Sequence, residues 1–203
     1  MKKTIAVAFI LGYTMVNVGY ATLVNPGFET GDFTGWSLSN SGLGAVVTSH
    51  VGSGTNYSPV EGSYFARLSA GAGEGVYTML SQPILLTLGD TLSGYAAFDY
   101  RDYDPFDDAA YVKVYDGLGN VVATPWYENG LAHPDFWDGP WTFWSWTAPS
   151  SGNYQLEYGV ANFVDNGWNS VALFDGVVPE PTSLLLLGAG FLALARKVRR
   201  RRG

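Results

Sequence analysis

Short runs of alternating apolar and polar residues fill the sequence between residues 45 and 178, and most of them end near glycine, asparagine, aspartate or proline. These runs are "AVVTSHV", "SYFARLSA", "VYTMLSQ", "TLSGYAAFDY", "AYVKVYDG", "NVVATPW", "WTFWSWT", "NYQLEYGVANF" and "SVALFDGVV". A period of two is typical of strands with one buried face, and no helical period of useful length replaces it. The sequence therefore predicts an all-β fold of about nine or ten antiparallel strands, in a sandwich or a barrel.

The run at 153–163 shows the expected faces most clearly. Tyr154, Leu156 and Tyr158 share one face of the predicted strand, and Gln155 and Glu157 share the other. Such a strand is half-buried, with one face in the core.

Charge is distributed very unevenly along the chain. Eight of the eleven Lys and Arg residues lie at the two ends, whereas all eighteen acidic residues fall between Thr22 and Pro181. The middle section therefore carries a net charge of −15. An acidic body repels phosphate backbones, so we expect no nucleic-acid partner; divalent cations suit it better.

The N-terminus predicts export. Two lysines precede the apolar stretch "TIAVAFILGYTMV", and small residues at Gly19 and Ala21 fit a signal peptidase site. We interpret residues 1–21 as a signal peptide, with an N-terminal membrane anchor as the alternative. Because the chain has no cysteine, an exported body at 22–177 must be stabilised by its core or by a metal ion.

The C-terminus combines three features in a fixed order. Pro179, Glu180 and Pro181 precede a mostly apolar stretch at about 183–195, which is followed by a basic cluster. The cluster consists of Arg196, Lys197, Arg199, Arg200, Arg201 and Arg202. The positive-inside rule predicts a transmembrane helix with these cations in the cytoplasm and the body outside. A buried core helix is the alternative, but six cations would then lie beside the core.

This tail, residues 178–203, resembles the PEP-CTERM sorting signal of Gram-negative bacteria that make exopolysaccharide. The resemblance implies recognition by an exosortase-type membrane enzyme and cleavage near the Pro-Glu-Pro segment. It further implies an intermediate anchored in the inner membrane, and then a protein at the cell surface or outside the cell.

Two other stretches resemble the first and last strands of jelly-roll, carbohydrate-binding-like domains. They are "NPGFETGDFTGW" at 25–36 and "GNYQLEYGVANFVDNGWNSVALFDGV" at 152–177. The resemblance implies an antiparallel jelly-roll β-sandwich with a structural Ca²⁺ bound by Glu29 and Asp175. Hard oxygen ligands of this kind suit calcium. The alternative is that Glu29 caps a turn and Asp175 faces solvent.

A second acidic group lies in "FDYRDYDPFDDAAYV". Asp102, Asp104, Asp107 and Asp108 follow Asp99 within ten residues, without the spacing of an EF-hand loop. These carboxylates form either a solvated acidic loop, which the charge run favours, or a weaker second metal cluster.

Tryptophans are concentrated between residues 126 and 146. Alternation in "WTFWSW" separates Trp141 and Phe143 from Trp144 and Trp146. We expect the first pair in the core and the second pair on an exposed platform that stacks on a neutral polysaccharide. The alternative is that both pairs are buried.

Catalytic patterns are weak. His50 and His133 are the only histidines, and neither has the spacing of a metal site or a triad. Three loop acids near the tryptophans, Glu128, Asp135 and Asp138, leave a glycosidase as one alternative. We expect a non-enzymatic surface or matrix protein associated with exopolysaccharide, and keep a dedicated carbohydrate-binding module as the other alternative.

Overall fold

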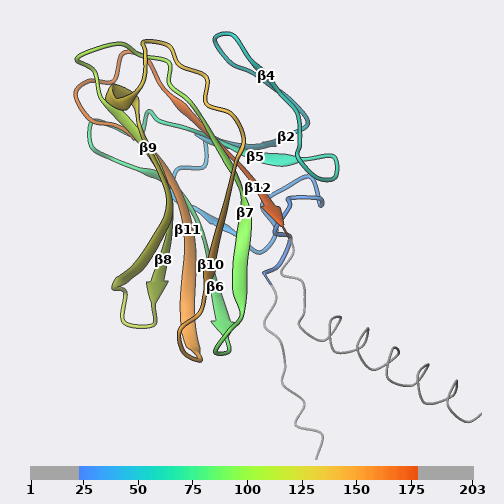
Figure 1. The fold of residues 1–203 in the computed structure, drawn as a ribbon. Coiled ribbons are helices and arrows are strands. Elements are labelled where there is room, and N and C mark those ends of the chain that lie inside the picture. Colours follow the sequence, from blue (N-terminus) through green and yellow to red (C-terminus); the bar gives the residue numbers. More distant parts are fainter. Residues whose placement is uncertain (1–22, 178–203) are drawn as a thin grey trace, which may run out of the picture.

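The computed structural model describes residues 23–177, which form two large antiparallel sheets facing each other (Figure 1). The signal peptide predicted at 1–21 and the sorting signal predicted at 178–203, with the helix expected in each, lie outside the described residues. Within the described part, no helix is both long and apolar enough to cross a membrane. Apart from one short 3-10 turn, all regular secondary structure of the described residues is β-strand, which confirms the all-β prediction.

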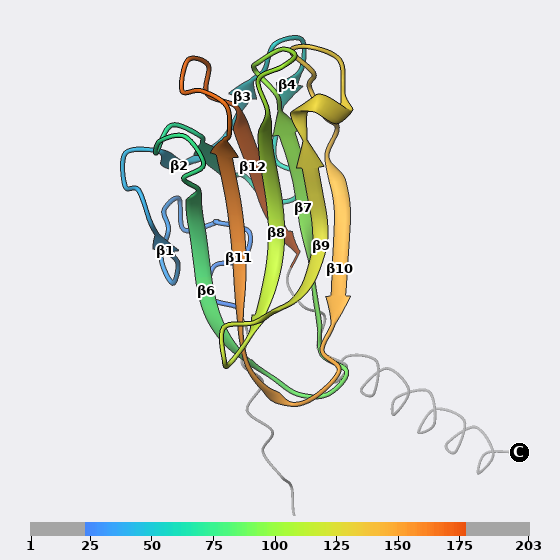
Figure 2. The same ribbon diagram turned by 90° about the vertical axis from the view of Figure 1, so that its left-hand side faces the viewer.

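The first sheet, sheet A, has the order β1-β6-β11-β8-β9, and the second, sheet B, has the order β10-β7-β12-β5-β2 (Figure 2). Two further strands, β3 and β4, form a separate hairpin. The elements are β1 (Ser37–Leu38), β2 (Gly44–Val47), β3 (His50–Val51), β4 (Asn56–Tyr57), β5 (Phe65–Ser69), β6 (Thr78–Leu86), β7 (Thr91–Asp99), β8 (Asp108–Asp116), β9 (Val121–Asn129), the 3-10 turn η1 (Gly130–Ala132), β10 (Thr142–Thr147), β11 (Gly152–Asn162) and β12 (Val171–Val177).

The connections identify a jelly roll. From β5 to β12 the chain crosses from one sheet to the other at every step except β8 to β9, which pair as a hairpin within sheet A. As a result, β11 lies between β6 and β8, and β12 lies between β5 and β7. This double Greek-key order confirms the predicted jelly-roll β-sandwich.

The predicted run at 45–51 differs from the structure because it is divided between two sheets. β2 ends at Val47 in sheet B, and the chain then turns to form the β3–β4 hairpin. Tyr57 of this hairpin packs with Phe65 and Leu173, so the hairpin covers a small second core on the outer side of sheet B. An alternating pattern does not show where a strand leaves its sheet, since both parts keep a period of two.

The main core lies between the sheets and is rich in aromatic rings. Tyr158 of β11 stacks on Phe174 of β12 with ring centroids 4.4 Å apart and an interplanar angle of 3°. Trp36, from the N-terminal segment, stacks on Tyr158 at 5.2 Å. Aromatic contacts of this kind join sheet A, sheet B and the N-terminal segment.

The acidic loop between β7 and β8 is only partly solvated. Asp102 and Asp108 are each 1% exposed, so the expected solvated loop is wrong for these two residues. Asp104 is exposed and Asp107 is half-buried. The pKa of Asp108 is raised to about 7, mainly by burial and in addition by the charge of Asp102. Hydrogen bonds from Ser170 lower this pKa in part.

We predict that Asp108→Asn changes the pH dependence of stability. The pKa of this carboxyl is about 7 in the folded protein and 3.8 ordinarily. Its contribution to the free energy of unfolding is therefore fully present below about pH 4, and it is lost as the pH rises to 7. The neutral amide has no such loss, so the variant should gain stability relative to wild type between pH 4 and pH 8. Thermal unfolding in the presence of chelator measures the difference. A difference that stays constant across this range would contradict the prediction.

Candidate functional site

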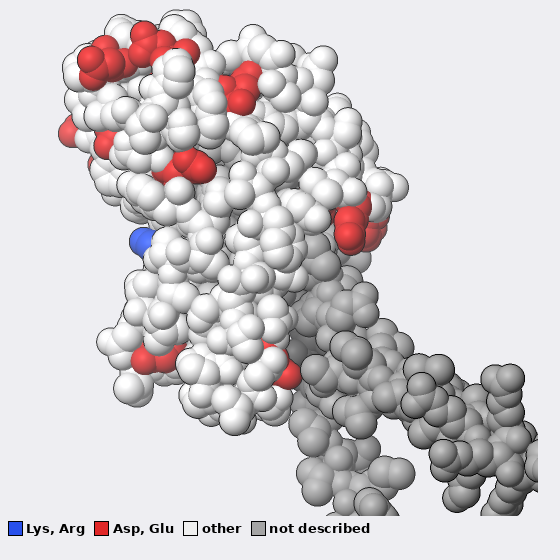
Figure 3. Space-filling view, in the orientation of Figure 1, with Lys and Arg blue, Asp and Glu red and all other residues white. Residues whose placement is uncertain are grey.

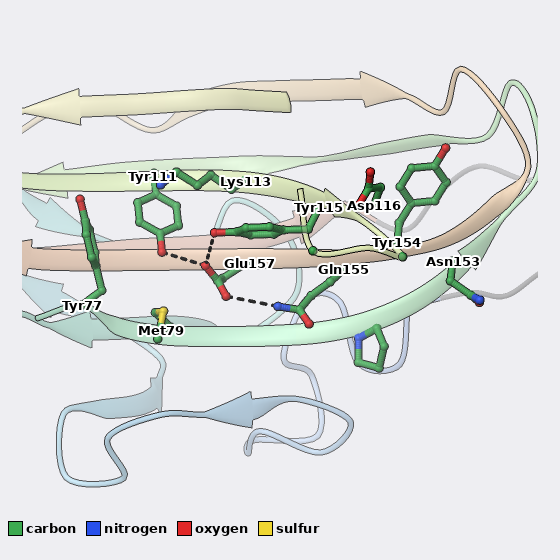
Figure 4. A pocket seen from close by; sticks show the side chains of 13 residues that line it. Tyr77, Met79, Tyr111, Lys113, Tyr115, Asp116, Asn153, Tyr154, Gln155 and Glu157 are labelled. Carbon is green, nitrogen blue, oxygen red and sulfur yellow. Dashed lines mark hydrogen bonds between the residues drawn. The ribbon is translucent and has the colours of Figure 1, made fainter. Parts of the chain in front are cut away.

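A cleft on the outer face of sheet A, with a volume of about 760 Å³, is a candidate site. It lies across β6, β11 and β8, where every second side chain points away from the core (Figure 4). The residues that line it are Tyr77, Met79, Pro83, Tyr111, Lys113, Tyr115, Asp116, Gly117, Gly119, Asn153, Tyr154, Gln155 and Glu157.

Glu157 is the centre of a hydrogen-bond network in this cleft. Its Oε1 accepts hydrogen bonds from the hydroxyls of Tyr111, at 2.8 Å, and Tyr115, at 2.9 Å. The Gln155 amide donates to Oε2 at 3.3 Å. Figure 4 shows both phenol rings directed toward the carboxylate, which is 7% exposed. The network therefore holds the two rings in place.

Burial, and then the neighbouring Glu157, keeps these phenols protonated. The pKa of Tyr115 is raised to about 12, first by burial and then by its hydrogen bond to Glu157. The pKa of Tyr111 is raised further, by burial and by the charge of Glu157. Both hydroxyls therefore remain hydrogen-bond donors across the physiological pH range.

Lys113 lies over the aromatic side of the cleft. Its ammonium nitrogen is 3.9 Å from the centroid of the Tyr111 ring and 5.7 Å from that of Tyr77. The rings of Tyr77 and Tyr111 contact each other at 4.8 Å. The cleft thus offers aromatic surface, a cation and fixed polar groups side by side, a combination that suits a ligand with both apolar and hydroxylated faces.

A glycine on β11 makes room for this arrangement. Gly159 pairs with Tyr111 across the β11–β8 ladder, and a Cβ at this position would overlap the Tyr111 ring. Sequence reasoning missed the cleft, although two signals were available. Gln155 and Glu157 were expected opposite the core face, and "AYVKVYD" places Tyr111, Lys113 and Tyr115 on one face of its strand.

The expected exposed platform of Trp144 and Trp146 is wrong. Trp144 is 2% exposed, and Trp146 is half-buried and packs against Tyr154 at 5.3 Å. The Trp144 ring lies over Gly94 of the neighbouring strand β7, where a Cβ would come within 2.9 Å of the ring. The core of the sandwich therefore receives the pair that was expected outside.

Trp141 and Phe143 do not fill the main core. Phe143 is 55% exposed on the outer face of sheet B. Trp141 precedes β10 and contacts Tyr57 and Phe65 in the small core under the β3–β4 hairpin, while its indole N–H donates to the Ser58 carbonyl at 3.0 Å. The alternation was correct, but its inward side was assigned the wrong way round.

Glu29 and Asp175 border a second, smaller pocket of about 230 Å³, which Glu61 also lines. Asp175 is 1% exposed, so it does not face solvent. Its Oδ2 accepts hydrogen bonds from the backbone N–H groups of Val60 and Glu61, whereas its buried Oδ1 has no partner within the described residues. Glu29 accepts from the N–H groups of the neighbouring loop, at 63 and 64.

The pocket has the chemistry of a hard-cation site. Burial raises the pKa of Asp175 to about 6, and the charges of Glu29 and Glu61 add to the rise. Glu29, Glu61 and Asp175 line the pocket, and a Cβ at Gly27 would come within 3.3 Å of the Gly176 carbonyl and 3.8 Å of the orphaned Oδ1. The residues fit a calcium ion in ligand type. Between residues 23 and 177, however, no three His, Asp or Glu side chains converge as a ready-made metal site, so backbone oxygens would have to complete the coordination.

The same finding applies to the acidic loop. Asp102, Asp104, Asp107 and Asp108 do not supply three converging carboxylates, so the structure does not assemble the weaker second metal cluster from them. Asp107 instead accepts a hydrogen bond from Asn129 at 2.9 Å.

The loop acids considered for a glycosidase each have a structural partner. Glu128 bonds His133 at 2.7 Å, Asp135 accepts from the Asp104 N–H at 3.1 Å, and Asp138 accepts three backbone N–H groups of the 53–55 turn. His50 is also paired, with the buried Asp99, at 2.7 Å.

Comparisons with known proteins identify the tail. Residues 177–202 match the PEP-CTERM protein-sorting motif. No curated protein matches this chain in sequence.

Several solved structures are similar to the body. One is the carbohydrate-binding module TmCBM61 in complex with β-1,4-galactotriose, with 20% identity over 76% of this chain and 94% of that chain, and a TM-score of 0.47. Another is the xylan-binding CBM22-1 domain from Paenibacillus barcinonensis, with 14% identity, coverage of 78% and 93%, and a TM-score of 0.41. An adhesin domain of Lys-gingipain from Porphyromonas gingivalis has 16% identity, coverage of 76% and 95%, and a TM-score of 0.46.

The motif at 177–202 implies that the chain is an exported protein processed by an exosortase-type system.

Proposed function

We propose that this chain is a non-catalytic cell-surface or matrix protein that is sorted by its tail and binds a neutral polysaccharide in the sheet A cleft. The cleft itself is the observation that carries the proposal. Tyr77 and Tyr115, which are both half-buried, supply aromatic faces for the C–H side of a sugar ring. Lys113, Gln155 and Asn153 supply hydrogen-bonding groups along the same surface.

Charge favours a neutral ligand. The body carries many more acidic than basic residues, and Glu157 lies in the middle of the cleft. A polymer of uronic acids or sulfated sugars would be repelled by this field. Lys113 is the only basic residue lining the cleft, so it offsets this repulsion only in part.

The arrangement supports binding rather than hydrolysis. A glycosidase needs two carboxyl groups about 5 to 9 Å apart, one to protonate the leaving group and one to act as nucleophile or base. In the cleft, both oxygens of Glu157 accept hydrogen bonds from protein side chains. Asp116 uses its Oδ1 to hold the β8–β9 turn, where it accepts the N–H groups of Leu118 and Asn120.

Removal of the aromatic surface tests this proposal. We expect Tyr77→Ala and Tyr115→Ala each to weaken retention on neutral polysaccharides by about tenfold, the factor that corresponds to roughly 1.4 kcal/mol of lost stacking. Affinity electrophoresis over a panel of such polymers measures the effect. Phe143→Ala, on the outer face of sheet B, is the matched control and should bind like wild type. Undiminished retention by both folded cleft variants would contradict the proposal.

The sorting part of the proposal concerns the tail. The order of Pro179–Pro181, apolar stretch and basic cluster supports a helix that spans the inner membrane, with the arginines inside, until an exosortase-type enzyme removes it.

We expect the mature protein to lack Met1 and to end near residues 179–181. Replacement of Pro179, Glu180 and Pro181 by alanine should leave the anchor in place and shift most of the protein to the membrane fraction. Cell fractionation and mass spectrometry of the C-terminus provide the measurement. A cytosolic protein that retains Met1 would rule out this route.

We also propose that the small pocket binds a structural Ca²⁺ through Glu29 and Asp175. The buried Oδ1 of Asp175 without a hydrogen-bond partner supports the proposal. Glu29 precedes β1 and Asp175 lies on the last strand, so one ion would join segments far apart in the chain. When bound, calcium would offset the repulsion between these carboxylates.

Calcium should therefore raise thermal stability, by about 2.7 kcal/mol at a concentration one hundred times its Kd. Glu29→Gln should abolish most of this gain, while Glu74→Gln, an exposed acid outside the pocket, should preserve it. Thermal unfolding with chelator and with added calcium gives the comparison. Identical curves for metal-free and calcium-saturated wild type would exclude the site.

A further inference from the structure

Three loops at one end of the sandwich bring exposed aromatic side chains together. Tyr103 lies between β7 and β8, Phe136 follows η1, and Trp168 lies between β11 and β12. They are 41%, 41% and 58% exposed, respectively. Ring centroids are 6.0 Å apart between Tyr103 and Phe136, and 5.8 Å apart between Phe136 and Trp168. We call Tyr103, Phe136 and Trp168 the loop-end surface.

The backbone holds these rings in position. Phe136 has a φ of 55°, a conformation that is uncommon for a residue other than glycine. Its N–H donates to the Asp102 carbonyl at 2.9 Å, which ties its loop to that of Tyr103. Phe106 packs edge-on against Tyr103 at 5.0 Å. Large apolar groups that remain exposed on such a supported surface mark interaction sites.

Acidic groups surround the loop-end surface. Asp104 adjoins Tyr103, Asp135 adjoins Phe136, and Asp165 shares a loop with Trp168. Asp102 is 1% exposed, and its Oδ2 has no hydrogen-bond partner among residues 23–177. Figure 3 shows acidic side chains gathered at this end of the molecule, the upper end in the view.

The nearest base in sequence does not neutralise these acids. Arg101 is committed elsewhere, since its Nε donates to Asp99 at 2.6 Å and its terminal nitrogen to the Val51 carbonyl at 2.9 Å. Exposed rings beside uncompensated carboxylates attract a ligand with an ammonium group, through ion pairing and cation–π contact together.

The loop that carries Trp168 contacts the cleft. Phe163, at the start of the loop that carries Trp168, contacts the cleft residue Tyr77 at 5.6 Å. The loop-end surface lies near the start of β12, whose seven residues extend about 23 Å to Val177.

We propose that the loop-end surface binds amino-sugar units with free amines, within the polysaccharide whose neutral units occupy the cleft. This inference rests on the proposed function, since the adjoining cleft is what favours a glycan over a basic peptide. The sugar ring stacks on Trp168 or Phe136, and its ammonium group pairs with Asp165 or Asp104.

Chitosan, as a polymer with free amines, and its fully N-acetylated form are the probes. The full chain in detergent should bind chitosan more tightly than the acetylated polymer. Trp168→Ala and Phe136→Ala should each weaken chitosan binding by about tenfold and leave binding to neutral polysaccharides unchanged. Asp165→Asn should weaken chitosan binding and reduce its sensitivity to salt. Trp168→Ala does not change the net charge. Weaker chitosan binding by this variant would therefore show recognition by the ring, rather than a general attraction of the acidic protein to a polycation.

The two proposals fail differently. Loss of neutral-polymer binding in Tyr115→Ala, with amine-dependent binding retained, supports two adjoining subsites. Phe143→Ala is the control for an exposed ring elsewhere and should bind both polymers like wild type. Equal binding of chitosan by wild type and by folded Trp168→Ala and Phe136→Ala variants would overturn the inference, as would equal affinity for the two polymers. Trp168-dependent binding of polylysine without binding of chitosan would overturn the choice of a glycan.

Discussion

The contact of Tyr158 with Phe174 orients both outer faces of the sandwich. These rings stack at 4.4 Å at the centre of the core, one from each sheet. Successive side chains of a strand point to opposite faces, so Glu157, beside Tyr158, must point out of sheet A. Asp175, beside Phe174, must point out of sheet B for the same reason. The positions of the cleft and of the small acidic pocket therefore both follow from the stacking of Tyr158 on Phe174.

The two outer faces differ in what covers them. The β3–β4 hairpin lies over part of sheet B, and the 60–64 loop covers Asp175, so polar groups on this side are buried and paired with backbone amides. Within residues 23–177, no segment covers β6, β11 and β8 in this way, and the outward side chains of sheet A form an open cleft. A buried carboxylate with an unpaired oxygen suits a cation, whereas an open row of tyrosines and amides suits a larger ligand.

Alternation in the sequence predicted the strands well but not their inward sides. "NYQLEYGVANF" has one face rich in large apolar residues, and its Gln155 and Glu157 lie outside as expected. "WTFWSW" has aromatic residues on both faces, and the choice depended on the neighbouring strand. Gly94 of β7 leaves space for Trp144 in the core, which no pattern within β10 itself reveals.

The sequence by itself determined the strand content, the acidic character of the body and the sorting motif at its end, because these depend on local periodicity, composition and the order of short segments. The pattern of strands left a sandwich and a barrel open, and the jelly-roll class was implied only by the resemblance of the segments 25–36 and 152–177 to known domains. Only the tertiary structure decided which residues form sites. Tyr77, Tyr111 and Glu157 come from three segments that meet when β11 inserts between β6 and β8. A single sequence does not show that residues so distant in the chain lie close together, since their proximity arises from sheet pairing rather than from local periodicity.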